Sequence, residues 1–507
     1  MVQHPTLRFL AAFTALICFA CLLLWVDTLI PQPMALSRRP TPPAAGTAQA
    51  SDVAAEIPEM ASESPPAPHQ TPSLSQPAAV EPAADAGRPD AHVVKRGESV
   101  TTVARAWLSR TSYMTALELE AAIREASGLK SGAPKPGEVL VIPGFQAEPV
   151  VEHPIARARD FEVHAIYLTG GMAGSDNGIR LIRHWHDVSG NAIVFDVKDS
   201  DGSVNVPFEH AFVPKGHRPP IRNLPKFIHF LHQNGMHAIA RIALFRDDNI
   251  AQHHSEFAVR SRRGGEPWRE NGKLVWSDPS QPEVQAYNIG LAKYVASAGA
   301  DEIQFDYVRF PAEGDQKDAQ FAFEKTHPAW KRFEVISDFL ARAYKELHAK
   351  GVLVSLDVFG VMAWQRPVDL SHTGQDIVEM AKHCDVLSPM IYPSHFFGMD
   401  GYALPGDAPE HFISESMERF QKVTEGSAVV LRPWLQAFGW KTKTYSPAYI
   451  ETQVSVAKDR GGIGFLFWNA RNDYAKPFAA MPEMRSKPAR FFHVDAPAAQ
   501  ARSTAGQ

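Results

Sequence analysis

The chain has 507 residues, which is more than one ordinary domain needs and enough for a large core with attached segments. Its net charge of -5 argues against broad nucleic-acid binding, which normally requires a basic face, so we expect no nucleic-acid partner. Two of the three cysteines lie in an apolar N-terminal run, which excludes a disulfide within the remaining chain. The third, Cys384, begins an apolar segment and is expected to be a buried side chain.

The first 30 residues predict a membrane-targeting segment. Residues 9–26 carry no charge, and their length lies between a signal-peptide core and a membrane-spanning helix. Because no small-x-small cleavage site follows, an uncleaved signal anchor is favoured over a cleaved signal peptide. We therefore expect a membrane-anchored protein that faces the periplasm or the cell exterior. Secretion after cleavage is the alternative.

Residues 31–91 are rich in Pro, Ala, Ser and Thr and have no hydrophobic period, which predicts a disordered linker. Residues 92–144 then predict a small module with the order strand, helix, helix, strand. Its opening VKRGESV and its closing LKSGAPKPGEVLVIPG resemble LysM domains, βααβ modules that bind N-acetylglucosamine polymers such as peptidoglycan. The middle, ALELEAAIREASG, lacks the usual asparagine-rich turn, so a spacer domain without sugar binding is the alternative.

Residues 160–480 predict the large domain, in which short apolar runs alternate with helical patterns. Near-continuous apolar strands between helices indicate a parallel sheet covered by helices, and eight of them predict an α/β fold of the (β/α)8 TIM-barrel type. A doubly wound open sheet is the alternative, although no dinucleotide or Walker loop follows the first strand. Residues 485–507 are rich in Ala and Pro and predict a disordered tail. The expected strands are 164–169, 192–197, 237–244, 302–308, 352–358, 385–391, 429–436 and 463–468.

Catalytic groups of a TIM barrel come from the C-terminal ends of its strands. Three aspartates stand at such ends and are our candidate catalytic residues: Asp196, Asp306 and Asp357. Since Ile303 and Phe305 alternate with Asp306, its carboxylate is expected to point into the barrel. An inward carboxylate at the rim must be satisfied by partners or take part in chemistry.

The same strand ends and the loops after them carry cationic, polar and aromatic side chains that we expect to bind substrate. These are Arg241, Arg309, Tyr392, His395, Trp434, Gln436, Trp468 and Asn469. Glycosidic cleavage requires two carboxyl groups, and an arginine nearby would lower the pKa of the nucleophile and keep it ionised. Flat aromatic faces suit sugar rings. In the polar loop 246–280, Trp268 and Trp276 are expected to be exposed. Without an HExxH or paired CxxC motif, we expect neither a metal nor a cofactor.

An ordered set of motifs resembles the bacterial glycosyl hydrolases of domain-of-unknown-function family 4015. The motifs are IVFDVKDSDG, ADEIQFDYVRFP with its lead-in, VSLDVFG, VLSPMIYPSHF, LRPWLQAF and GGIGFLFWNA, and they span roughly 160–480. The resemblance implies a TIM-barrel hydrolase without fixing the substrate. A chitinase-like pattern would place a glutamate two residues after Asp306, where Val308 stands. An amylase-like pattern makes Asp306 the nucleophile and Asp357 the acid.

The sequence thus predicts an envelope-anchored glycoside hydrolase that cleaves a cell-envelope or extracellular polysaccharide by a two-carboxylate mechanism. Asp306 would be the nucleophile and Asp357 the general acid, with Asp196, Arg241 and Arg309 assisting. The LysM-like module would contact peptidoglycan, and the N-terminal segment the membrane. The alternatives are a barrel that binds glycan without cutting it and a scaffold that the module docks to the wall.

Overall fold

The computed structural model describes residues 90–130 and 132–493. The predicted membrane-targeting segment, the predicted linker up to residue 89 and residues 494–507 of the predicted tail lie outside these described ranges. Among the residues described, no helix is both long enough and apolar enough to cross a membrane.

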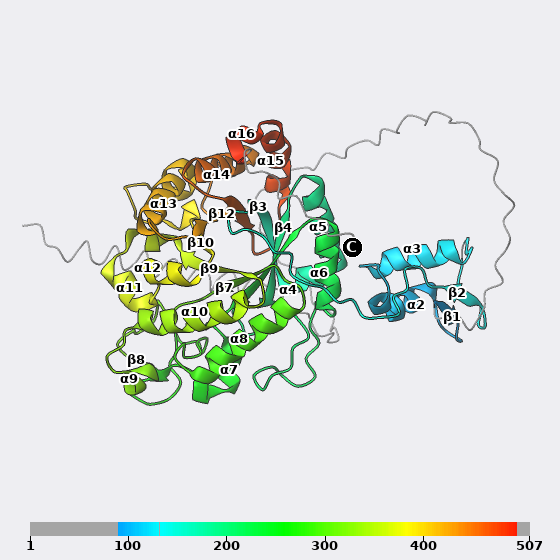
Figure 1. The fold of residues 1–507 in the computed structure, drawn as a ribbon, viewed down its shortest axis with the longest axis horizontal. Coiled ribbons are helices and arrows are strands. Elements are labelled where there is room, and N and C mark those ends of the chain that lie inside the picture. The colour runs from blue at the N-terminus through cyan, green and yellow to red at the C-terminus, as the bar shows by residue number, and fades with distance from the viewer. Residues whose placement is uncertain (1–89, 131, 494–507) are drawn as a thin grey trace, which may run out of the picture.

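A small module precedes the large domain and has the predicted order of elements. It consists of β1 (Ala91–Val93), α2 (Val100–Trp107), α3 (Ala116–Ala126) and β2 (Val139–Val141), and the two strands pair antiparallel. Both helices begin at capping boxes, in which the side chains of Ser99 and Thr115 accept hydrogen bonds from backbone N–H groups of the first turn. The module lies outside the large domain, near α5 and α6 (Figure 1).

The large domain is a closed barrel with eight parallel strand positions in the part of the chain that the structure describes. Each strand pairs with the next along the chain, β9 pairs with β10, and β13 pairs with β3 to close the ring. This closure confirms the predicted TIM barrel and excludes the open sheet. The strands are β3 (Val163–Leu168), β4 (Ala192–Lys198), β5 (His237–Ala243), β7 (Glu302–Asp306), β9 (Leu353–Phe359), β10 (Val386–Met390), β11 (Val430–Leu431) with β12 (Trp434–Gln436), and β13 (Gly464–Trp468).

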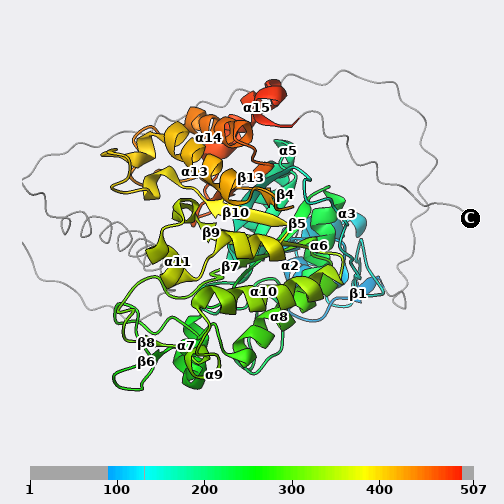
Figure 2. The same ribbon diagram turned by 60° about the vertical axis from the view of Figure 1, so that its left-hand side comes forward.

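Helices surround this barrel on its outside (Figures 1 and 2). Four of them are followed by a glycine with positive φ, which suits the left-handed conformation at a helix end: Gly235, Gly299, Gly351 and Gly461. The helices are α4 (Gly170–Ala173), α5 (Asp176–Asp187), α6 (Leu224–Gln233), α7 (Asp248–His253), α8 (Pro282–Ser297), α9 (Phe323–Thr326), α10 (Arg332–His348), α11 (Pro367–Thr373), α12 (Ile377–Met380), α13 (Pro409–Val423), α14 (Pro447–Asp459), α15 (Ala475–Ser486) and α16 (Pro488–Phe491).

Alternate residues of the strands pack into two separate apolar cores. The side chains that face outward meet the helices in the large core, while a small set fills the barrel interior. In β7, Ile303 and Phe305 belong to the outer core, so Glu302, Gln304 and Asp306 face inward. The interior set is Val163, Ala165, Tyr167, Ala192, Val194, Ile239, Tyr392, Trp434 and Leu466.

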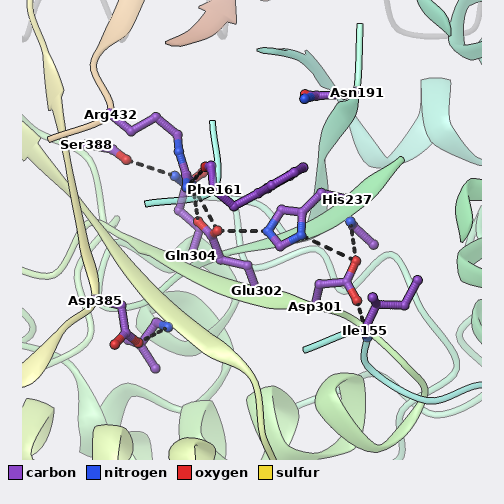
Figure 3. Close-up of polar contacts among 12 residues, drawn as sticks. Ile155, Phe161, Asn191, His237, Asp301, Glu302, Gln304, Asp385, Ser388 and Arg432 are labelled. Atoms are coloured by element: carbon purple, nitrogen blue, oxygen red, sulfur yellow. Dashed lines mark hydrogen bonds and ion pairs between the residues drawn. The ribbon is translucent and has the colours of Figure 1, made fainter. Parts of the chain in front are cut away.

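A buried polar network fills the barrel at the N-terminal ends of its strands (Figure 3). Arg432 donates to both oxygens of Glu302, at 2.8 and 3.0 Å, and a ring nitrogen of His237 lies 3.0 Å from the same carboxylate. Burial alone would raise the pKa of Glu302, but Arg432 and His237 outweigh it and lower the pKa to about 2. Arg432 is fully buried and belongs to this network at the base of the barrel.

Three expectations need correction. Trp268 and Trp276 are buried, with 4% and 1% of their surfaces exposed, because loop 246–280 folds back onto the segment after β7. The indole of Trp268 donates to the Asp315 carbonyl, for example. The predicted tail begins too early, since α15 and α16 continue to Phe491, which is buried. The seventh strand is interrupted after Leu431 because Pro433 has no N–H for the ladder.

Candidate active site

Three aspartates from different strands surround one arginine at the C-terminal end of the barrel. Arg241 of β5 donates to Asp196 of β4 at 2.5 Å and to Asp306 of β7 at 2.6 and 3.2 Å. Its Nε atom also lies 3.8 Å from Asp357 Oδ2 of β9. We refer to these four residues as the aspartate–arginine cluster. The predicted catalytic residues are therefore brought together at one place, as closure of the ring requires.

The two carboxylates proposed for chemistry are close neighbours within the cluster. Asp306 Oδ2 and Asp357 Oδ2 lie 3.2 and 3.8 Å from the same Arg241 nitrogen. The two oxygens are therefore at most about 7 Å apart, which is below the upper limit of roughly 9.5 Å for carboxyl pairs that flank a glycosidic bond.

Asp196 is completely covered and both of its oxygens have partners. One oxygen accepts from Arg241, and the other accepts from the phenol of Tyr167 on β3. Burial raises the pKa of Asp196 to about 7, with the nearby Asp199 adding to the effect and Arg241 opposing it. With no surface exposed, Asp196 is suited to hold Arg241 rather than to touch a substrate.

Asp357 has one partnered and one unpartnered oxygen. Trp434 of β12 donates its indole N–H to Oδ1 at 2.6 Å, whereas Oδ2 has no hydrogen bond in the structure. Burial and the neighbouring Asp306 charge raise the pKa of Asp357 well above its ordinary value, and Arg241 offsets only part of this. Asp357 is thus a carboxyl group that favours its protonated form.

Asp306 is the most exposed carboxylate of the three, at 8% against 1% for Asp357 and 0% for Asp196. Its Oδ1 atom accepts from the backbone N–H of Tyr307 at 2.6 Å, while Oδ2 accepts from Arg241. Tyr307 itself has φ of +49°, a backbone conformation that is costly for a residue other than glycine. The backbone after β7 therefore has a defined conformation in which the Tyr307 N–H orients the Asp306 carboxylate.

Arg309 does not pair with the cluster but lies among aromatic rings beside it. Its guanidinium is 4.4 Å from the ring centre of Phe359 and 4.8 Å from that of Trp276, and Nη1 donates to the Phe310 carbonyl. Burial lowers the pKa of Arg309, with the charges of Glu270 and Asp306 opposing the shift. Its predicted role in substrate binding stays a prediction.

The other predicted substrate-binding residues divide into two groups. Trp434, Tyr392 and Trp468 line the interior near Asp357, and Tyr392 and Trp468 have ring centres 5.7 Å apart. Gln436 and Asn469, by contrast, use their amide groups to hold loops: Gln436 accepts from Ser394 N–H and donates to the Phe438 carbonyl, and Asn469 donates to the carbonyls of Ala437 and Asp473. His395 is buried between Tyr392 and Trp440.

Two residues near the site were not anticipated from the sequence. Tyr167 could have been suspected because it alternates with Ala165 and so stands at an inward position of the first strand, HAIYLT. Glu313, in the loop after β7, is buried, accepts from Asn271 at 2.8 Å through Oε2 and has no partner for Oε1. Burial and the adjacent Glu270 raise the pKa of Glu313 to about 7. A loop glutamate of this kind has no periodic signal.

Several solved structures are similar to this chain. A hypothetical protein from Ruminiclostridium thermocellum is 37% identical over 38% of this chain and 97% of its own, with a TM-score of 0.32. The PgaB (BpsB) glycoside hydrolase domain from Bordetella bronchiseptica is 16% identical over 66% of this chain and 98% of its own, with a TM-score of 0.47. The C-terminal domain of a chitinase-like protein from Desulfitobacterium hafniense is 13% identical over 64% and 99%, with a TM-score of 0.41.

The comparison with curated proteins gives no match. A family model does match, and it covers residues 165–474, more than half of the chain and nearly all of the barrel. The chain therefore belongs to domain-of-unknown-function family 4015, the "Putative glycosyl hydrolase domain" family.

Proposed function

We propose that the barrel is a glycoside hydrolase that cleaves a cell-envelope or extracellular polysaccharide with Asp306 and Asp357 as its two working carboxyl groups. The observation that supports the proposal is that Asp306 and Asp357 share Arg241 as a neighbour. Both carboxylates approach the same nitrogen of Arg241, and Asp357, the more deeply buried of the two, has a pKa raised well above its ordinary value. Two neighbouring carboxyl groups in unlike environments are the usual basis for dividing acid and nucleophile roles.

Asp357 would act as the general acid. Because Oδ1 already accepts the Trp434 indole N–H, the proton belongs on Oδ2, which has no other hydrogen-bond partner. That proton would pass to the glycosidic oxygen as its bond to the anomeric carbon breaks, so the leaving sugar departs as an alcohol.

Asp306 would act as the nucleophile. Its carboxylate would attack the anomeric carbon and form an ester with the sugar, which water then hydrolyses. Asp357, by then ionised, would take the proton from that water and return to its starting state. Arg241 would hold both carboxylates in register, while Asp196 and Tyr167 would position Arg241.

The location of the enzyme is a proposal that rests on the sequence. The uncharged run at residues 9–26 supports a membrane anchor with the barrel in the periplasm or outside the cell, and secretion after cleavage is the alternative. Glycan contact through the LysM-like module is likewise proposed, on the two motifs that bound it and on its strand, helix, helix, strand order.

A screen of peptidoglycan and secreted exopolysaccharides for release of soluble sugar identifies the substrate. Aryl glycosides of that sugar with poor and good leaving groups then distinguish the role of Asp306 from that of Asp357. D357N should lose kcat/KM on a poor leaving group and keep most of it on the 2,4-dinitrophenyl glycoside, whose leaving group departs without a proton, while its kcat falls on both because the second step has lost its base. D306N should lose activity on both. If D357N is equally inactive on both substrates while E313Q shows the leaving-group dependence, Glu313 is the acid instead.

The control is D278N, which changes a buried aspartate outside the cluster that accepts from Ser280 and the Ala322 N–H. It should retain activity on both substrates. Wild-type protein that binds a polysaccharide but releases no sugar from it would favour the alternative function, a barrel that binds glycan without cutting.

A further inference from the structure

Beyond the aspartate–arginine cluster, aromatic rings continue outward from the barrel mouth. Tyr392 follows β10, Phe438 follows β12 and Trp468 ends β13, and their ring centres are 5.4 to 5.7 Å from one another. The rings of Phe438 and Trp468 are half-buried, whereas Tyr392 is buried beneath them. The negative charges of Asp357 and Asp306 help to raise the pKa of Tyr392, so these rings adjoin the cluster.

The row of rings continues through the loops after β10 and β12. His395 lies 5.7 Å from Phe438 and 5.4 Å from Trp440, and Trp440 lies 5.5 Å from Phe397. Trp440 and Phe397 are half-buried like the inner rings. We call Phe438, Trp468, Trp440 and Phe397 the aromatic strip.

The outer end of the strip carries a cation on a strained backbone. The Lys441 ammonium lies 3.8 Å from the ring centre of Phe397 and 4.6 Å from that of Trp440. Lys441 has φ of +48°, which costs free energy in a residue other than glycine and is common where surrounding structure fixes a ligand-binding shape. The Trp440 turn is therefore held in place.

The four rings of the aromatic strip are each partly exposed and adjoin one another directly or through His395, so together they present a continuous apolar surface. Large apolar surface left in contact with water usually marks a binding site. The occupant must have flat apolar faces and also polar edges, since the strip begins at carboxylates and ends at an ammonium. Pyranose rings meet this description, with C–H groups on their faces and hydroxyls at their edges.

We propose that the aromatic strip binds successive sugar units of a glycan chain that extends from the cluster toward Lys441. The proposal rests on the glycosidase function proposed above and deepens it. The substrate is then a polysaccharide held over several units, rather than a disaccharide or a small glycoside confined to the cluster.

Native gel electrophoresis of the full chain through gels that contain a dissolved polysaccharide tests the strip. Three probes cover three chemistries: a neutral β-glucan, cationic glycol chitosan and an anionic polyuronate. At least one of them should retard the wild-type protein. W440A and F397A should weaken that retardation about fivefold or more, as expected for loss of one stacked ring. F478A is the matched control, because Phe478 is half-buried on α15, where it stacks against His184.

Thermal unfolding of each variant checks that the barrel is intact, and Y402A, which changes an exposed aromatic outside the strip, serves as a second control. The proposal is overturned if no probe retards the wild type, or if W440A and F397A migrate like the wild type in the gel that retards it. Sugar release by the wild type separates the two proposals. If the wild type is retarded but releases no sugar, the glycosidase function is wrong and the strip remains a binding site. If the wild type releases sugar but W440A and F397A are retarded as the wild type is, the strip proposal is wrong and the glycosidase function remains.

Discussion

Arg241 is the residue on which the site depends, because its planar guanidinium reaches carboxylates from three other strands at once. A lysine would keep the charge but present a single point of contact. We therefore expect R241K to lower kcat by about two orders of magnitude, since misplaced carboxylates lose the geometry of attack. Steady-state kinetics on the screened polysaccharide measures this. Activity of R241K within a few-fold of wild type would show that the guanidinium fork is dispensable.

The pH profile tests the protonated state of Asp357. Its pKa is raised above the ordinary value, so activity should be present below that pKa and be lost as pH rises through it. The hydrogen bond from Trp434 stabilises the charged form and lowers the pKa, so W434F should move the alkaline limb to higher pH. An alkaline limb of kcat/KM that stays fixed in W434F would mean that another group, such as Glu313, controls it.

Individual site residues were predictable where strand periodicity applied. Alternation along β7 and β9 indicated that Asp306 and Asp357 would face inward, and both contact Arg241. Periodicity gives no information on depth along the barrel axis, however, so it could not show that Glu302 would pair with Arg432 at the base. Glu313 lies in a loop, where neither the alternation of a strand nor the period of a helix indicates which side chains face inward.

At the scale of elements, the base of the barrel depends on the buried pair of Glu302 and Arg432. Removing one charge leaves the other uncompensated in a site without water access, so E302Q should lower the free energy of unfolding by about 3 to 5 kcal/mol. Chemical denaturation measures this. The double variant E302Q/R432M should recover part of the loss, and E302Q as stable as wild type would contradict the account.

The same pair gives a pH dependence of stability. The pKa of Glu302 is about 2 in the folded chain against an ordinary value of 4.5, so its stabilising contribution is complete above the ordinary value. That contribution should be lost as pH falls from 4.5 toward 2, and the loss should be missing in E302Q. Equal acid sensitivity of both proteins in thermal unfolding would contradict this.

The strands of the barrel were predictable from apolar runs, within a few residues at each end. The sequence could not show that the seventh strand would break at Pro433, because the apolar run continues across it. Nor could it show that loop 246–280 would fold back and bury Trp276. A polar composition indicates that much of a loop is exposed, but it does not show which of its apolar side chains pack against the domain.

At the scale of the whole molecule, the module contacts the outside of the barrel at two polar points. Lys226 of α6 donates to the Leu108 carbonyl at 2.6 Å, and Arg183 of α5 pairs with Glu118 of α3. Both contacts are made by helices of the layer outside the barrel.

The predicted anchor gives a test of localisation. Fractionation of cells that produce the full chain should place it in the membrane fraction, and deletion of residues 1–30 should abolish export, so that the shortened chain stays in the cytoplasm. Protease added to intact spheroplasts should degrade the full chain only. Protein that is found free in the culture medium and lacks the N-terminal segment would instead support a cleaved signal.

The central claim is that Asp306 performs chemistry at the barrel mouth, and the most direct test is sugar release from the screened polysaccharide by D306N together with its thermal unfolding. The account predicts that release is abolished and that the unfolding temperature is nearly unchanged, because asparagine keeps the shape and Arg241 retains Asp196. Sugar release at the wild-type rate, or a collapse of thermal stability, would contradict it.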